Sequence, residues 1–458
     1  MLQKKLVKKI FVEVINPGNC FHCGLCAGLS NNLFKMKETR KGPIPKLIRK
    51  PIKDDISDLK KIVSACPGRG VPYNHLSKNL TTLKKSKILG NYNSLYIASS
   101  NSKLIRKQAS SGGLVRSLLI ELIKSKKVNY VCILDENKNK LLNFDLSITK
   151  NINKILNISQ SIYQTTPLLH KLKKLRKNKK YVFVGLPEHI ASLRILKIKY
   201  PKEFNHIKYL ISIYSGTNMY PGAIDFYLKG NGIDNIKNIK KLNWRYGEWP
   251  GMLRIVTKDN KILSLKKFYY NYLIPFFISK NSLITPDFTG ELSDISVGDA
   301  WSPKLENKGH GYSVVITRSK VFDKILTKLK RKKSIYLKYI NFKNTVSMHA
   351  HMLEFKKVGS YLRIEKLKKK GPVPLYDLKP KNISFLRKKI ELLIGLIIST
   401  ASNKNVKSFF SLINSTVMGF IFKILRQLWK SITKPTKRKG LDNLKIIKVK
   451  NKRVEEFV

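Results

Sequence analysis

The chain has 458 residues and a formal charge of +63 at neutral pH, because 91 lysines and arginines outnumber 28 aspartates and glutamates. Its length allows two or three domains with a sizeable core. The charge is spread along the chain, and no zinc finger, helix-turn-helix or RNA-binding aromatic motif accompanies it. Nucleic acid is therefore not an expected partner.

The N-terminal residues lack the apolar run and the cleavage pattern of a secretory signal. No stretch reaches the roughly 18–20 apolar residues that a membrane-spanning helix requires. We therefore expect a cytoplasmic protein. Thiols stay reduced in that compartment, so the five cysteines are not expected to form disulfides.

Four of the cysteines have the spacing of metal ligands. Cys20, Cys23 and Cys26 form C-x2-C-x2-C, and the distant Cys66 is followed by proline. Three clustered thiolates plus one Cys-Pro are typical ligands of a ferredoxin-type [4Fe–4S] cluster. Zinc is the alternative metal, although its structural sites usually use two separated cysteine pairs. We predict one [4Fe–4S] cluster in a ferredoxin-like cysteine module over residues 1–90.

Strands and helices alternate from about residue 91. Strands are expected at Asn93–Ser99, Val128–Leu134, Tyr181–Gly185 and Ile207–Tyr214, with helices within Arg106–Lys127, Ala191–Leu196 and Tyr220–Leu228. This alternation predicts an α/β domain over residues 91–240 with mainly parallel strands. The fifth cysteine, Cys132, lies in an apolar strand and is interpreted as a core residue.

The first of these helices begins with the sequence S-S-G-G. Ser110 or Ser111 can cap the helix, and Gly112 and Gly113 expose backbone N–H groups at its start. Such a helix start can bind a phosphate or pyrophosphate. An ordinary helix cap without a ligand is the alternative interpretation.

The second half of the chain has a different pattern. An aromatic, glycine-rich stretch at Trp244–Gly251 precedes a predicted hairpin around Lys258–Asn260. Two further strands are expected within Asp294–Trp301 and Tyr312–Thr317. We predict an α+β domain over residues 241–375.

Residues 376–458 are predicted to form basic amphipathic helices. Apolar residues recur at three- and four-residue steps, as one helix face would require: Val406, Phe409, Phe410, Ile413, Val417, Phe420, Ile424 and Leu428. Lys407, Lys423, Arg426 and Lys430 lie elsewhere on that helix. This face can lie on an anionic membrane surface, or it can pack on the protein body or a partner.

Several motifs occur in one order along residues 15–375. They are C-x2-C-G-x-C, C-P-G, R-x3-S-S-G-G, S-Q-S-I-Y-Q, V-F-V-G-L-P, W-R-Y-G-E-W-P-G and P-D-F-T-G-E-L-S-D-I-S-V-G-D-A-W. In this order they resemble the coenzyme F420 hydrogenase/dehydrogenase beta-subunit family of iron–sulfur flavoproteins. The sequence G-P-V-P-L-Y at Gly371 resembles its bacterial branch, whose members are encoded among polysaccharide genes.

The resemblance implies an oxidoreductase that passes electrons from a ferredoxin-type donor through the cluster to FAD and an unknown substrate. It assigns flavin binding to the α/β domain, with contacts from Arg106, Ser110, Ser111, Gly112, Gly113, Ser159, Ser161, Tyr163, Gly185, Pro187, Gly298, Asp299 and Trp301. Glu188 or His189 is the candidate proton donor, although either can simply be a residue at a helix start. The bacterial branch implies a role, and partner proteins, in surface polysaccharide biosynthesis.

The sequence departs from the family at positions where relatives carry further cysteines. Glu188, Ser215, Ser282 and Thr285 occupy these positions, so a second cluster is not expected. The alternative function is a non-catalytic accessory of polysaccharide assembly that has lost part of its redox site. In that case the C-terminal helices would dock at the inner face of the membrane or on a partner protein.

Overall fold

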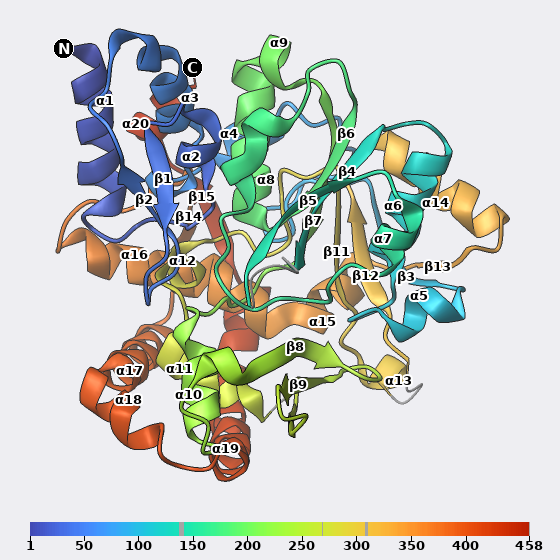
Figure 1. The fold of residues 1–458 in the computed structure, drawn as a ribbon, viewed down its shortest axis with the longest axis vertical. Coiled ribbons are helices and arrows are strands. Elements are labelled where there is room, and N and C mark those ends of the chain that lie inside the picture. Colours follow the sequence, from blue (N-terminus) through green and yellow to red (C-terminus); the bar gives the residue numbers. More distant parts are fainter. Residues whose placement is uncertain (137–141, 268, 307–309, 458) are drawn as a thin grey trace.

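The computed structural model describes residues 1–136, 142–267, 269–306 and 310–457, and its centre is an eight-stranded sheet (Figure 1). The strand order is β13-β3-β12-β11-β7-β6-β4-β5. The strands are β3 (Ser94–Ser100), β4 (Tyr130–Glu136), β5 (Phe144–Thr149), β6 (Tyr181–Gly185), β7 (Ile207–Ile213), β11 (Ile295–Asp299), β12 (Ser313–Thr317) and β13 (Ile335–Tyr339).

The expected strands are confirmed, and two of the three strand pairs formed within the described part of residues 91–240 are parallel, as expected. Strands β4, β6, β7 and β11 form three parallel pairs. The other four pairs of the sheet are antiparallel. The reason is that β12 follows β11 in the sequence and pairs with it directly, which requires a reversal of direction. β12 then pairs with β3 on its other side.

The central sheet takes strands from both sides of the predicted boundary near residue 240, and the domain boundaries themselves stay predictions. The hairpin predicted around Lys258–Asn260 is confirmed as β9 (Met252–Thr257) and β10 (Ile262–Lys266). With β8 (Ile239–Tyr246) it forms a separate three-stranded sheet.

Helices cover both faces of the central sheet. Apolar residues of α6 (Leu114–Lys124) and α14 (Lys320–Arg331) pack against one face. On the other face lies α8 (Pro187–Lys199), which contacts α3 (Ile56–Ala65) of the N-terminal module. Cys132 is fully buried in this second core, as the apolar strand predicted. The cysteine module and the sheet therefore share one apolar core.

The N-terminal module further contains α1 (Leu2–Ile10), α2 (Leu25–Leu29), β1 (Phe34–Lys37), β2 (Ile44–Leu47) and α4 (Tyr73–Ser77). The other helices before residue 370 are α5 (Lys103–Lys107), α7 (Ile152–Leu156), α9 (Pro201–Phe204), α10 (Gly222–Lys229), α11 (Leu273–Phe277), α12 (Lys280–Ile284), α13 (Pro303–Glu306), α15 (Phe342–Glu354) and α16 (Ser360–Lys368).

The C-terminal segment consists of β14 (Leu378–Lys381), α17 (Phe385–Ser402), α18 (Lys404–Phe410), α19 (Ser415–Asp442), β15 (Lys445–Lys448) and α20 (Lys452–Glu455). The single helix face expected from the apolar repeat is wrong, because the chain bends by 113° between α18 and α19. After α19, β15 pairs with β14 and returns the chain to the N-terminal module, so both chain ends lie near α1 (Figure 1).

In the described part of the chain, no single helix has the length and apolar character that would cross a membrane. Taken together, α18 and α19 meet that length and composition only as a sharply bent pair.

Candidate functional site

The four predicted ligand cysteines line one cavity in the N-terminal module. Cys20 and Cys23 lie in the loop before α2, Cys26 lies within α2, and Cys66 directly follows α3. The rest of the lining is largely apolar, with Ile10, Val14, Ile15, Phe21, Leu25, Met36, Pro45 and Pro67 among it. Packing of α2 against α3 thus brings the distant cysteine to the other three.

The ligand loop is tightly folded at Gly24, whose φ is +81°. A Cβ atom here would lie 2.7 Å from the carbonyl oxygen of Pro167, so only glycine fits without strain. The neighbouring Cys23 accepts a hydrogen bond at its carbonyl from Leu169 N–H (2.8 Å). The loop is therefore held against residues 167–170 of the α/β domain.

Burial raises the pKa of the Cys20 thiol to about 12, and it also raises the pKa values of Cys23, Cys26 and Cys66. The N–H of His22 donates a hydrogen bond to Cys20 Sγ (3.4 Å). Such N–H···S contacts favour thiolates once a metal neutralises their charge. An apolar cavity with four converging thiols and N–H donors fits an iron–sulfur cluster.

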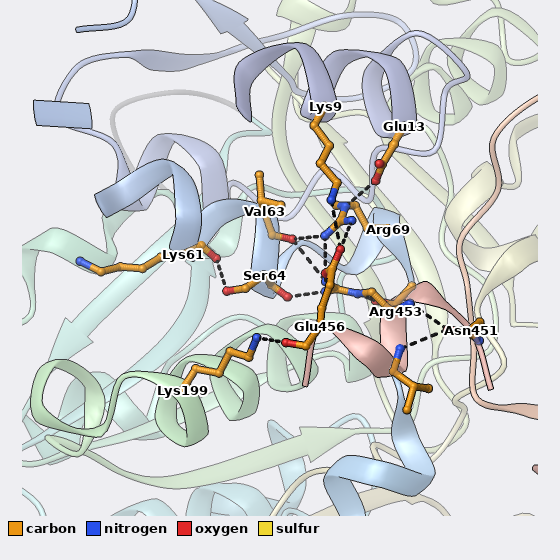
Figure 2. A network of polar contacts seen from close by, with 12 residues as sticks. Lys9, Glu13, Lys61, Val63, Ser64, Arg69, Lys199, Asn451, Arg453 and Glu456 are labelled. Carbon is orange, nitrogen blue, oxygen red and sulfur yellow. Dashed lines mark hydrogen bonds and ion pairs between the residues drawn. The ribbon is translucent and has the colours of Figure 1, made fainter. Parts of the chain in front are cut away.

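The C-terminal residues close over the Cys66 loop (Figure 2). Arg453, which is 1% exposed, donates hydrogen bonds to the carbonyl oxygens of Gly70 (2.9 Å) and Ser64. The carboxylate of Glu456 accepts from Arg453 (2.5 Å) and from Arg69 (2.5 and 2.8 Å). Two buried guanidinium groups therefore lie beside the candidate cluster, and one carboxylate holds both.

The predicted flavin residues gather at one edge of the central sheet. The parallel strands β4, β6, β7 and β11 all end there, and ligands of α/β sheets bind outside the carboxyl ends of such strands. Ser159 donates to Asp135 at the end of β4 (3.1 Å). Gly185 ends β6, and Asp299 ends β11.

Arg245, in β8, donates hydrogen bonds to three of these residues. It is 2% exposed, and its guanidinium donates to Tyr163 Oη (3.1 Å), Asp299 Oδ2 (3.0 Å) and the carbonyl oxygen of Ser110 (2.6 Å). Lys267 Nζ donates to the same Tyr163 oxygen (2.9 Å). The sequence reasoning did not assign Arg245 or Lys267 to the site. The only available signal was the position of Arg245 within W-R-Y-G-E-W-P-G.

The expectation that Ser110 or Ser111 caps the following helix is wrong. Gly113, with φ +75°, is the residue before α6, and no side chain caps that helix. Instead, Ser110 Oγ accepts from Ser161 N–H (2.9 Å), and Ser111 Oγ donates to the Tyr312 carbonyl (2.8 Å). The serines thus tie the loop to its neighbours across the site.

Gly112 is needed for packing. Its N–H donates to Ser313 Oγ (3.1 Å), and a Cβ atom would lie 2.6 Å from the Ala98 carbonyl oxygen. A phosphate at this helix start would therefore have to use other N–H groups.

Aromatic side chains and unpaired polar atoms border the same edge. The Trp301 ring packs on Trp249 with 4.6 Å between centroids, and the Arg106 guanidinium lies 5.3 Å from the Tyr312 ring centroid. Among the described residues, the buried atoms without a hydrogen-bond partner include Gln108 Oε1, Gln160 Oε1 and Trp249 Nε1. Buried polar atoms normally have partners, so this edge fits a polar, planar ligand such as a flavin.

Two family models match the chain. The N-terminal model of the coenzyme F420 hydrogenase/dehydrogenase beta subunit matches residues 95–173, and the C-terminal model of the same subunit matches residues 178–343. Together these spans exceed half of the chain. The chain belongs to the coenzyme F420 hydrogenase/dehydrogenase beta-subunit family. Membership places it among oxidoreductases, and the matched spans contain the sheet edge but not the four clustered cysteines.

One solved structure that resembles this family member is the xenon-derivatised F420-reducing [NiFe] hydrogenase complex from Methanosarcina barkeri. The TM-score is 0.51 at 17% identity, and the alignment covers 64% of this chain and 99% of that chain. The two proteins therefore share a fold. The comparison with curated proteins gives no match.

In this family member, Glu188 lies in the first turn of α8 and is buried. Asn281 Nδ2 donates to its carboxylate (3.4 Å), and Lys356 Nζ donates to the neighbouring Ser282 carbonyl (2.7 Å). Thr285 Oγ1 donates to the Asn281 carbonyl (2.6 Å). Three positions where the resemblance places cysteines in relatives thus meet in one hydrogen-bonded group.

The two candidate proton donors differ in protonation. Burial raises the pKa of Glu188, although Lys356 opposes this effect. Burial lowers the pKa of His189 to about 3, and its Nδ1 accepts from Leu186 N–H (3.2 Å). A neutral His189 is a poor general acid near pH 7. The assignment of either residue as proton donor stays a prediction.

The pKa of the Tyr163 hydroxyl is lowered although the side chain is buried. Burial alone would raise the pKa of its hydroxyl, but Lys267 and Arg245 reverse this effect and lower the pKa to about 8. We expect Tyr163→Phe to remove one tyrosinate transition near pH 8 from an ultraviolet titration. Tyr227→Phe is the matched control, because burial raises the pKa of Tyr227 to about 12. Identical titrations of the wild type and Tyr163→Phe would contradict the assignment.

Proposed function

We propose that this family member passes electrons from a ferredoxin-type donor through one [4Fe–4S] cluster to FAD and on to an unidentified substrate. The observation that carries the proposal is the common cavity of Cys20, Cys23, Cys26 and Cys66. These thiols come from two distant segments, and a shared metal centre would account for four cysteines around one largely apolar cavity.

The arrangement favours a cluster over a single zinc ion. Zinc holds thiolates at about 2.3 Å, so its four ligands must meet at one point. Within the described ranges, no three Cys, His, Asp or Glu side chains are arranged to hold a metal ion. The choice of a cluster therefore rests on the ligand pattern, because three clustered cysteines and one Cys-Pro are typical of a [4Fe–4S] cluster.

The sheet edge would hold the flavin. Bound there, FAD would supply two-electron storage and hydride transfer. Arg245 and Lys267 would place positive charge beside the ligand, and Tyr163 would offer a hydroxyl whose lowered pKa suits proton transfer. The Trp249–Trp301 pair would shield the ligand from water.

The proposed pathway is surface polysaccharide biosynthesis, and its support is the G-P-V-P-L-Y sequence at residues 371–376. This segment also packs on the cysteine module. Asn19 Nδ2 donates to the Pro372 carbonyl (2.8 Å), and Leu375 N–H donates to the Arg69 carbonyl (3.1 Å). The segment therefore lies against the two loops that carry the candidate cluster ligands.

The test is anaerobic purification of the full chain, with measurement of iron, zinc, acid-released flavin and the visible spectrum. We expect about four iron atoms per chain, a broad cluster absorption that dithionite bleaches, and bound FAD. Stoichiometric zinc would contradict the cluster. A folded, colourless protein without metal or flavin would contradict the redox function and favour the accessory role.

A further inference from the structure

The segment that contains helices α17, α18 and α19 has more exposed large apolar side chains than all the rest of the described chain. In the part of the chain that the structure describes, 28 large hydrophobic residues are exposed, and fifteen of them lie between Phe385 and Ile432. On α19 they include Phe420 (54% exposed), Ile424 (43%) and Leu428 (55%). Scattered exposed apolar residues are ordinary, but a concentration of this kind marks an interaction surface.

The exposed residues follow the helical repeat on each helix. On α17 they are Phe385, Leu386, Leu392, Leu393, Leu396 and Ile397, and on α19 they are Val417, Phe420, Ile421, Ile424, Leu425, Leu428 and Ile432. The two helices contact each other. They lie with α18 at the lower end of the view in Figure 1, away from both chain ends. The 113° bend between α18 and α19 spreads the apolar residues over a broad surface.

The charges on these helices are almost all positive. Residues 385–442 contain twelve lysines and arginines but only two acidic residues, Glu391 and Asp442. Glu391 is buried and paired with Arg363 (2.6 Å) and Arg387 (2.8 Å). The surface that remains is apolar and cationic, which is the composition of helices that lie in an anionic membrane interface.

After Leu428, α19 carries a basic pocket. Lys430, Lys434 and Arg438 line it together with Ser431 and Pro435. The three cations are four residues apart and thus share one side of the helix. A lipid phosphate can be held by such cations, and each basic residue near an anionic leaflet adds to binding.

We propose that α17–α19 form a docking surface for an anionic lipid bilayer. The apolar side chains enter the headgroup and acyl boundary, and the basic pocket binds headgroup phosphates. The three helices then lie in the plane of the interface. This inference does not depend on the cluster or on the flavin.

The test is flotation of the full-length protein with phosphatidylcholine vesicles, with and without phosphatidylglycerol. We expect binding only to the vesicles that contain phosphatidylglycerol, and binding that weakens with salt. Replacing Phe420, Ile424 and Leu428 with serine is expected to weaken binding about a hundredfold. The matched control replaces Ile48, Leu83 and Ile262 with serine, because these are 50%, 70% and 56% exposed outside the surface.

Replacing Lys430, Lys434 and Arg438 with glutamine is expected to weaken binding about a hundredfold. Its control makes the same change at Lys366, Lys368 and Lys369, which are exposed at the end of α16. Failure of the wild-type protein to bind the anionic vesicles would overturn the proposal. Unchanged binding by the α19 serine variant would also overturn it. A lipid-free dimer that this variant abolishes would assign the surface to a second copy and also overturn it.

Discussion

Cys66→Ser is expected to remove the cluster, so that bound iron falls from about four atoms per chain to nearly none. Cys66 is the one ligand that α3, and not the N-terminal loop, supplies. Without it the cavity keeps only three of the four thiol ligands that a [4Fe–4S] cluster requires. Anaerobic iron analysis and the visible spectrum measure the effect.

Cys132→Ala is the matched control for this substitution. Cys132 is equally buried but lies in β4, away from the other four thiols. We expect it to keep the iron and the spectrum, although a cavity in the core lowers stability somewhat. Iron retained by Cys66→Ser, or lost by Cys132→Ala, would contradict the ligand assignment. Circular dichroism of both variants separates loss of metal from loss of fold.

Glu456→Gln is expected to lower the free energy of unfolding by about 3 kcal/mol. The carboxylate is the shared partner of Arg69 and Arg453, whose side chains are only 6% and 1% exposed. The substitution leaves the buried Arg453 guanidinium without its carboxylate partner and leaves Arg69 paired with Glu13 alone. Urea unfolding of wild-type and variant protein in the same metal state measures the change.

The pH dependence of this effect has a definite sign. Burial opposes ionisation of Glu456, but Arg69 and Arg453 lower its pKa from 4.5 to about 2. The stabilisation is therefore complete above about pH 4.5 and is lost as the pH falls towards 2. Glu455→Gln, at the exposed neighbouring position, is expected to leave stability unchanged. Equal destabilisation by both variants would refute the proposed contact.

Individual strands and helices could be predicted because the hydrophobic pattern of each lies within its own residues. Hydrophobic periodicity indicated strands β3, β4, β6 and β7 and helix α8 within a few residues, since side-chain direction repeats along one element. The order of the sheet could not be predicted in this way. Pairing of β12 with β3 depends on packing between segments about 200 residues apart.

The residues of the candidate site could also be predicted only in part. Tyr163 and Asp299 were predicted from motifs, but Arg245 and Lys267 have no motif that predicts burial next to a tyrosine. Their contacts join residues 163, 245, 267 and 299. Charged residues are rarely buried, so the sequence alone would place both cations at the surface.

The sequence by itself predicted the four candidate ligand cysteines, three of them from the C-x2-C-x2-C spacing and Cys66 from the proline that follows it. It also determined the resemblance to the beta-subunit family that the comparison then showed. Only the tertiary structure decided that the C-terminal residues close over Cys66 and that the apolar face of α19 is exposed. Burial and contacts between distant segments result from packing of the whole chain, and amphipathic spacing is the same on a buried helix and an exposed one.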